Sequence, residues 1–192
     1  RSMSGSAGFS PKINDPAFAK YQKASNKWAL TFAIILALIA IVGFPIYGEK
    51  SGEMEMPQSL YYGLAIGGMF IAIALIQIFR KGRDITWDGV IVGKQVFERT
   101  THDKNTDTQT THTVYEYKVK RSSGKVHKHQ HQDCDTVFNY FDIGDKVRHH
   151  KGFDGYEKYD KSKDAIIFCI ACGTINNISD EVCVRCKCPL LK

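Results

Sequence analysis

Residues 28–47 have the sequence WALTFAIILALIAIVGFPIY, and residues 60–79 have the sequence LYYGLAIGGMFIAIALIQIF. Each block is twenty residues long and contains no charged side chain. At about 1.5 Å per residue, a helix of this length crosses the hydrocarbon core of a bilayer, which is about 30 Å thick. The first block is longer than the apolar part of a signal peptide, and no small-residue cleavage site follows it. The two blocks predict a transmembrane helical hairpin over residues 28–79.

The charges beside the two blocks predict how the hairpin is oriented. Residues 1–27 contain five basic residues and one acidic residue, and Arg80, Lys81 and Arg83 follow the second block. The connection over residues 48–59 contains three acidic residues and one basic residue. Positively charged flanks stay in the cytoplasm. We therefore expect a multi-pass protein of the cell membrane, with the lipid bilayer as a partner and with both the N-terminus and the C-terminus in the cytoplasm.

The second block contains a pair of glycines, Gly63 and Gly67, in a G-x-x-x-G pattern. Small residues at this spacing allow two helices to approach closely. The neighbouring helix is either the first block or a helix of another chain, and the sequence leaves both alternatives open.

Residues 84–164 are predicted to form a cytoplasmic β-rich domain. Apolar residues recur at even spacing in two segments, which is typical of half-buried strands; they are Val90, Val92 and Val96, and Tyr115, Tyr117 and Val119. A turn over residues 121–125 leads to a third strand over residues 126–132, and residues 135–141 fit one helical turn. We expect a small β-barrel or sandwich.

Two further segments of the chain are polar and lack periodicity. Residues 100–113 (TTHDKNTDTQTTHT) are expected to form a loop between two strands. Residues 1–27 are expected to be a cytoplasmic N-terminal segment, and its first part gives no signal of a structural element.

Three histidines alternate with other residues in the predicted third strand. His127, His129 and His131 would share one face of this strand, and Cys134 follows closely. These residues could form a second metal site or a pH-sensitive face, because imidazole gains its charge between about pH 5 and 8. The alternative is a polar strand face in water.

The strongest motif lies at the C-terminus. Five of the six cysteines follow residue 168, in the frame C-x2-C, ten residues, C-x2-C. Two such pairs can surround one zinc ion with four thiolates at about 2.3 Å. Gly173 suits the turn after the first pair because it tolerates a positive φ, and Asn176–Asn177 is the expected turn of a hairpin between the pairs. Disulfides, a redox C-x-x-C and an iron–sulfur cluster are the alternatives, but a reducing cytoplasm and the odd number of thiols argue against disulfides.

This segment, over residues 165–192, resembles the zinc-ribbon family, in particular the short C-terminal ribbons of bacterial proteins with the pattern C-x-x-C-G, spacer, C-x-x-C-G-x-P-L. The resemblance implies a C-terminal zinc ribbon on a two-helix bacterial membrane protein. It also implies a Zn²⁺ ion and four metal ligands, namely Cys169, Cys172, Cys183 and Cys186. Lys187 departs from the second glycine of the pattern, and Cys188 adds a fifth thiol that is an alternative to Cys186.

No catalytic motif is present, and a site with four protein ligands leaves no open position for a substrate, so we do not expect an enzyme. Residues 84–192 contain 17 basic and 16 acidic residues, so nucleic-acid binding is not expected either. The ribbon contains more apolar residues than so short a hairpin can bury: Ile175, Ile178, Val182, Val184, Leu190 and Leu191.

The sequence therefore predicts an α+β membrane protein that acts as an accessory or interaction subunit. Its β-domain and structural zinc ribbon would be presented to a partner protein or to a second copy of the chain. A membrane-tethered metal or redox sensor is the first alternative, and a membrane-tethered nucleic-acid binder is the second.

Overall fold

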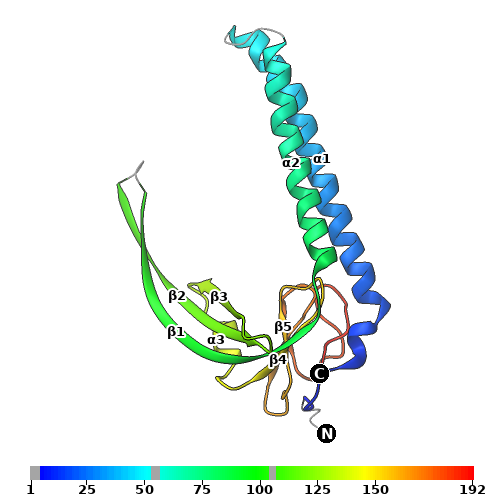
Figure 1. The fold of residues 1–192 in the computed structure, drawn as a ribbon, viewed down its shortest axis with the longest axis vertical. Coiled ribbons are helices and arrows are strands. Elements are labelled where there is room, and N and C mark those ends of the chain that lie inside the picture. The colour runs from blue at the N-terminus through cyan, green and yellow to red at the C-terminus, as the bar shows by residue number, and fades with distance from the viewer. Residues whose placement is uncertain (1–4, 53–56, 104–106) are drawn as a thin grey trace. The chain divides into compact units, whose positions relative to one another are not determined.

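The computed structural model describes residues 5–52, 57–103 and 107–192. It divides into two compact units (Figure 1). Asp15–Asp84 forms a helical unit. Residues 5–14 and Ile85–Lys192 together form a β-rich unit, so two segments that are far apart in the sequence belong to one folded body.

The helical unit is a hairpin of α1 (Pro16–Ser51) and α2 (Gln58–Arg83). Local sequence explains where α1 begins and ends. The carboxylate of Asp15 accepts a hydrogen bond from the backbone N–H of Ala17 at 2.8 Å, and Gly52 ends the helix at a φ of 66°. The two predicted apolar helices are confirmed, and both extend beyond the uncharged blocks.

Small residues form the contact between α1 and α2. A Cβ atom added to Gly63 would lie 2.9 Å from the Ala40 carbonyl oxygen, and one added to Gly67 would lie 3.1 Å from the Ala37 carbonyl oxygen. The G-x-x-x-G pair therefore packs within the hairpin, which is the first of the two alternatives.

The large apolar side chains of the hairpin point outward. In the most apolar stretch of each helix, only 11% of the residues of α1 and 17% of those of α2 are buried. A core helix of a soluble protein would be mostly buried. Both helices are long and apolar enough to cross a membrane, as the sequence predicted.

The β-rich unit contains an antiparallel sheet in the order β3-β2-β1-β4-β5. Its strands are β1 (Trp87–Asp103), β2 (Thr108–Arg121), β3 (Val126–Gln132), β4 (Lys146–His149) and β5 (Tyr156–Lys158). The short helix α3 (Thr136–Tyr140) confirms the helical turn expected between β3 and β4.

The sheet is open, so the barrel, one of the two predicted forms of this domain, is not closed. Within the described residues, β3 and β5 are its two edges and do not pair with each other. Beside the end of β5, the N-terminal segment takes the place of a further strand: the backbone N–H of Gly8 donates to the Tyr159 carbonyl at 2.8 Å, and Ala7 forms a β-bridge with Asp160. This contact protects part of one edge from unwanted pairing.

The predicted loop over residues 100–113 is also wrong for the most part. β1 and β2 continue through it in a long curved ribbon, with Thr100 opposite Thr111 (Figure 1). The hydroxyl oxygens of these two threonines are 3.1 Å apart. Polar as it is, the segment is rich in threonine, whose branched Cβ favours extended backbone. Its tip, residues 104–106, lies outside the described residues.

The core of the unit lies on one face of the sheet. Its buried side chains come from five elements and are Ile91, Tyr117, Val119, Tyr140, Phe141, Val147 and Tyr156. The predicted alternation along β2 is confirmed only in part: Tyr117 and Val119 are buried and Lys120 is exposed, but Glu116, which was expected on the opposite face, is buried as well.

A buried ion cluster attaches the N-terminal segment to the sheet. The Glu157 carboxylate accepts hydrogen bonds from the Ser10 backbone N–H at 2.7 Å and from Lys161 Nζ at 2.9 Å, and its second oxygen is 2.6 Å from His150 Nε2. Lys161 Nζ also donates to the Gly8 carbonyl at 3.0 Å. Burial raises the pKa of Glu157, but its hydrogen-bond partners and the Lys161 charge outweigh burial and lower it below 4.5.

Candidate metal centre

The first cysteine pair lies in the turn between β6 (Ile166–Phe168) and β7 (Ile175–Asn177). The backbone N–H of Gly173 donates to the Cys169 carbonyl at 2.8 Å, and the N–H of Cys169 donates to the Thr174 carbonyl at 2.9 Å. The expected turn at Asn176–Asn177 is wrong, because both residues belong to β7 and the cysteine pair itself is the turn.

The second pair repeats the backbone of the first. The N–H of Lys187 donates to the Cys183 carbonyl at 3.1 Å, and the N–H of Cys183 donates to the Cys188 carbonyl at 2.8 Å. Gly173 has a φ of 71° and Lys187 a φ of 62°. Lys187 replaces the second glycine of the zinc-ribbon pattern, yet it adopts the left-handed conformation that a glycine would adopt more easily. The chain therefore departs from the pattern in this side chain but not in the backbone of the turn.

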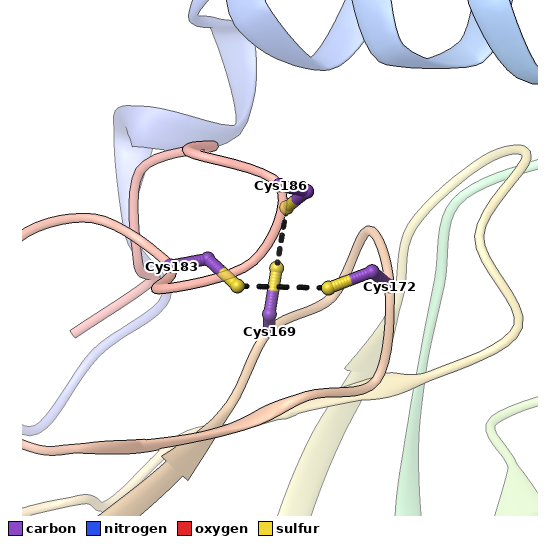
Figure 2. A group of neighbouring side chains, drawn as sticks. All are labelled: Cys169, Cys172, Cys183 and Cys186. Carbon is purple, nitrogen blue, oxygen red and sulfur yellow. Dashed lines mark hydrogen bonds between the residues drawn. The ribbon is translucent and has the colours of Figure 1, made fainter.

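The four predicted ligands lie together. Figure 2 shows their sulfur atoms pointing toward one another from the two turns. The Sγ atoms of Cys169 and Cys186 are 3.5 Å apart, as are those of Cys172 and Cys183, and all four lie within 4.8 Å of one another. Four sulfurs at about 2.3 Å from one ion would be about 3.8 Å apart in a regular tetrahedron. The cluster therefore fits one metal ion that is held by four sulfur atoms in a tetrahedron.

Burial and hydrogen bonds act differently on the thiols. Burial raises the pKa of Cys169 to about 12 and also raises that of Cys186. Burial acts against ionisation of Cys183 as well, but backbone N–H groups of Cys186 and Arg185 outweigh it and lower the pKa to about 6. Four thiolates so close together repel one another, so a cation is needed to stabilise them all in the ionised form.

Asn176, which the sequence analysis did not single out as a site residue, joins the two turns. Its amide nitrogen donates to the Thr174 carbonyl at 2.8 Å and lies 3.7 Å from Cys183 Sγ. Its amide oxygen accepts from the backbone N–H of Val184 at 2.8 Å. The Asn176 side chain is buried on the inner face of β7. A polar residue on that inner face was the sequence signal that could have revealed this role.

Cys188 is not part of the sulfur cluster. The four sulfurs that lie within 4.8 Å of one another include Cys186 but not Cys188. Cys188 occupies the position in the second turn that Thr174 occupies in the first, and it is buried. The geometry therefore favours Cys186 as the fourth donor.

The alternating histidines of β3 turn toward aromatic side chains. The His129 ring stacks on Tyr117 with ring centres 5.1 Å apart, and its Nε2 is 2.8 Å from the Tyr156 hydroxyl. His131 also stacks on the Tyr117 ring, with ring centres 6.1 Å apart. Burial lowers the pKa of His129 to about 4, so this imidazole is neutral at physiological pH.

The structure supports neither a metal site nor a polar face in water for the histidine strand. Among the described residues, the only group with metal-binding geometry is the cysteine cluster, and Cys134 is exposed and apart from it. The histidine face is not a polar face in water either, because His127 and His129 pack on Trp87 and Tyr117.

Comparison with known proteins gives no relative for this chain. No protein-family model, no curated protein and no solved structure matches it.

Proposed function

We propose that the chain is a membrane-anchored accessory protein whose cysteine cluster holds one structural Zn²⁺. The observation that carries this proposal is the set of four converging sulfurs on two matching turns. Tetrahedral sulfur sites suit zinc or iron–sulfur clusters, and two C-x2-C turns around one centre are the usual frame of a structural zinc site. With four protein donors, the ion keeps no open position for a substrate, so the proposal does not include catalysis.

In this proposal the two apolar helices cross the bilayer as a hairpin. Residues 5–10 contact residues 157–161 within one folded unit, which supports placing the segments before and after the hairpin on the same side of the membrane. The basic flanks of the hairpin favour the cytoplasm for that side.

The ribbon supplies the surface for a partner protein. Ile178, Leu190 and Leu191 are buried, so half of the apolar residues noted in the sequence stabilise the unit itself. Ile175, Val182 and Val184 are 44%, 47% and 59% exposed. We define these three side chains as the ribbon patch, and we propose that they contact the partner.

Substitution of the ribbon patch tests this function. Chain purified from native membranes in mild detergent is compared with the variant Ile175→Ser, Val182→Ser, Val184→Ser, and with the matched control Val126→Ser, Ile143→Ser, which changes exposed apolar residues elsewhere on the unit. We expect the patch variant to keep its zinc and to lose proteins that the wild type and the control retain. Recovery of the same proteins from all three would refute the docking role.

The sensor alternative receives no support from a second cluster, because the described histidines form none. The near-equal numbers of basic and acidic residues over residues 84–192 continue to argue against a nucleic-acid binder.

A further inference from the structure

The β-rich unit carries a groove on the face of the sheet opposite its core. Its volume is about 540 Å³. Val90 on β1 lies in this groove, while its neighbour Ile91 is fully buried on the core side. The size is within the range of about 300–1,000 Å³ that is typical of small-molecule sites.

The floor and one wall of the groove are apolar. Val90 and Val92 line the floor and remain 36% and 43% exposed. The N-terminal segment supplies the wall, where the ring of Phe9 meets that of Tyr159 edge-on with centres 5.1 Å apart. The N-terminal segment therefore forms part of the groove.

Two lysines stand on opposite sides of this floor. Val90 is paired with Lys120 on β2 and with Lys146 on β4, so the two lysines are separated by two strand spacings, or about 10 Å. Their long side chains can meet over the valine. Arg148 nearby is already committed to Asp88 through two hydrogen bonds of 2.6 and 2.8 Å.

Neither lysine has an anionic partner in the part of the chain that the structure describes. Lys146 Nζ contacts only the face of the Tyr159 ring, at 5.8 Å, and Lys120 is exposed. The groove, which Arg121 also lines, thus combines positive charge with an apolar floor. Its charge and polarity complement an anion that carries an apolar group.

The connection to the hairpin favours a lipid as this anion, an argument that rests on the proposed membrane anchoring. Only residues 84–86 separate α2 from β1, and four residue steps span at most about 14 Å. The groove begins at Asp88, the second residue of β1. An acidic peptide would more commonly add to an open sheet edge, whereas the backbone of β1 at Val90 already pairs on both sides.

We propose that this groove binds the headgroup of one anionic phospholipid of the membrane that holds the hairpin. The lipid phosphate lies between Lys120 and Lys146, and the glycerol and first methylene groups lie on Val90 and Val92. Bound in this way, the lipid fixes one face of the β-rich unit against the membrane.

Lipid titration of the delipidated full chain in detergent tests the site. Native mass spectrometry counts bound phosphatidylglycerol and phosphatidylcholine for the wild type, for Lys120→Glu with Lys146→Glu, and for the matched control Lys128→Glu with Lys163→Glu, which changes two exposed lysines outside the groove. We expect the wild type and the control to bind one phosphatidylglycerol at least tenfold more tightly than phosphatidylcholine, and the groove variant to lose this preference for one lipid.

Several results would overturn the proposal. Equal binding of both lipids, or an unchanged preference in the groove variant, would show that the groove is not the site. Displacement of the lipid by inorganic phosphate at equal concentration would indicate a site for a soluble anion, and tighter binding of a glutamate-rich peptide would indicate a protein ligand. Zinc content and membrane extraction of the groove variant are measured in parallel, so a failed lipid site leaves the proposed function separately testable.

Discussion

At the scale of single residues, the two cysteine turns provide a matched pair of substitutions. Lys187 and Gly173 occupy equivalent left-handed positions, which cost a non-glycine residue about 1–2 kcal/mol. Lys187→Gly should therefore stabilise the ribbon by about 1 kcal/mol, and Gly173→Ala should destabilise it by a similar amount. Because metal binding and folding of such a site are coupled, zinc affinity should rise about fivefold in the first variant and fall about fivefold in the second. Competition with a chromophoric chelator measures both, and an equal affinity in the two variants would contradict the assigned backbone geometry.

Asn176 is the residue expected to hold the two turns in register. Asn176→Ala removes the hydrogen bonds to Thr174 and Val184 and the contact with the Cys183 sulfur. Loss of a residue that contacts a metal ligand, without itself binding the metal, typically lowers metal affinity about 10- to 100-fold. The control is Asn177→Ala, because the Asn177 side chain is exposed and, among the described residues, accepts hydrogen bonds only from Ser179. A similar loss of zinc in both variants would mean that Asn176 has no special role.

At the scale of elements, the histidine face of β3 makes the stability of the β-rich unit depend on pH. The pKa of His129 is about 4 in the folded chain and about 6.5 when unfolded. Between these values the unfolded chain binds more protons, so stability should fall as pH decreases from about 6.5 to about 4. His129→Gln should flatten this dependence, whereas Lys128→Gln on the exposed side of the strand should not.

Denaturant unfolding of the full chain at several pH values measures this effect. Trp87 reports it by fluorescence because its ring contacts His127, and Trp28→Phe removes the second tryptophan of the chain. An identical pH dependence with and without His129 would show that another group is responsible.

The same elements show what the sequence could and could not predict. Residues 28–47 and 60–79 are uncharged and long, and the cysteine spacing is local, so the hairpin helices and the sulfur cluster followed from composition and spacing. The packing of the N-terminal segment on the sheet could not be predicted in this way, because the Ser10–Glu157 hydrogen bond joins residues 147 positions apart. The choice between a barrel and a sandwich could not be made for a related reason: closure of a sheet depends on which strands pair, and alternation along one strand carries no such information.

For the molecule as a whole, we predict that the segments on both sides of the hairpin are cytoplasmic. Protease added to intact cells should leave the region after residue 84 uncut, while permeabilised cells should lose it. A tag inserted in the connection between α1 and α2 should be accessible from outside the intact cells. Cleavage of the C-terminal region in intact cells would contradict the topology.

The central claim is that one zinc ion organises the ribbon of this membrane-anchored chain. Its most direct test is metal analysis by mass spectrometry of the full chain extracted from membranes with detergent. We expect about one zinc per chain, lost in Cys172→Ser or Cys183→Ser and kept in Cys134→Ser, since Cys134 lies outside the cluster. Iron with visible absorption, or zinc that persists in Cys172→Ser and Cys183→Ser, would contradict it.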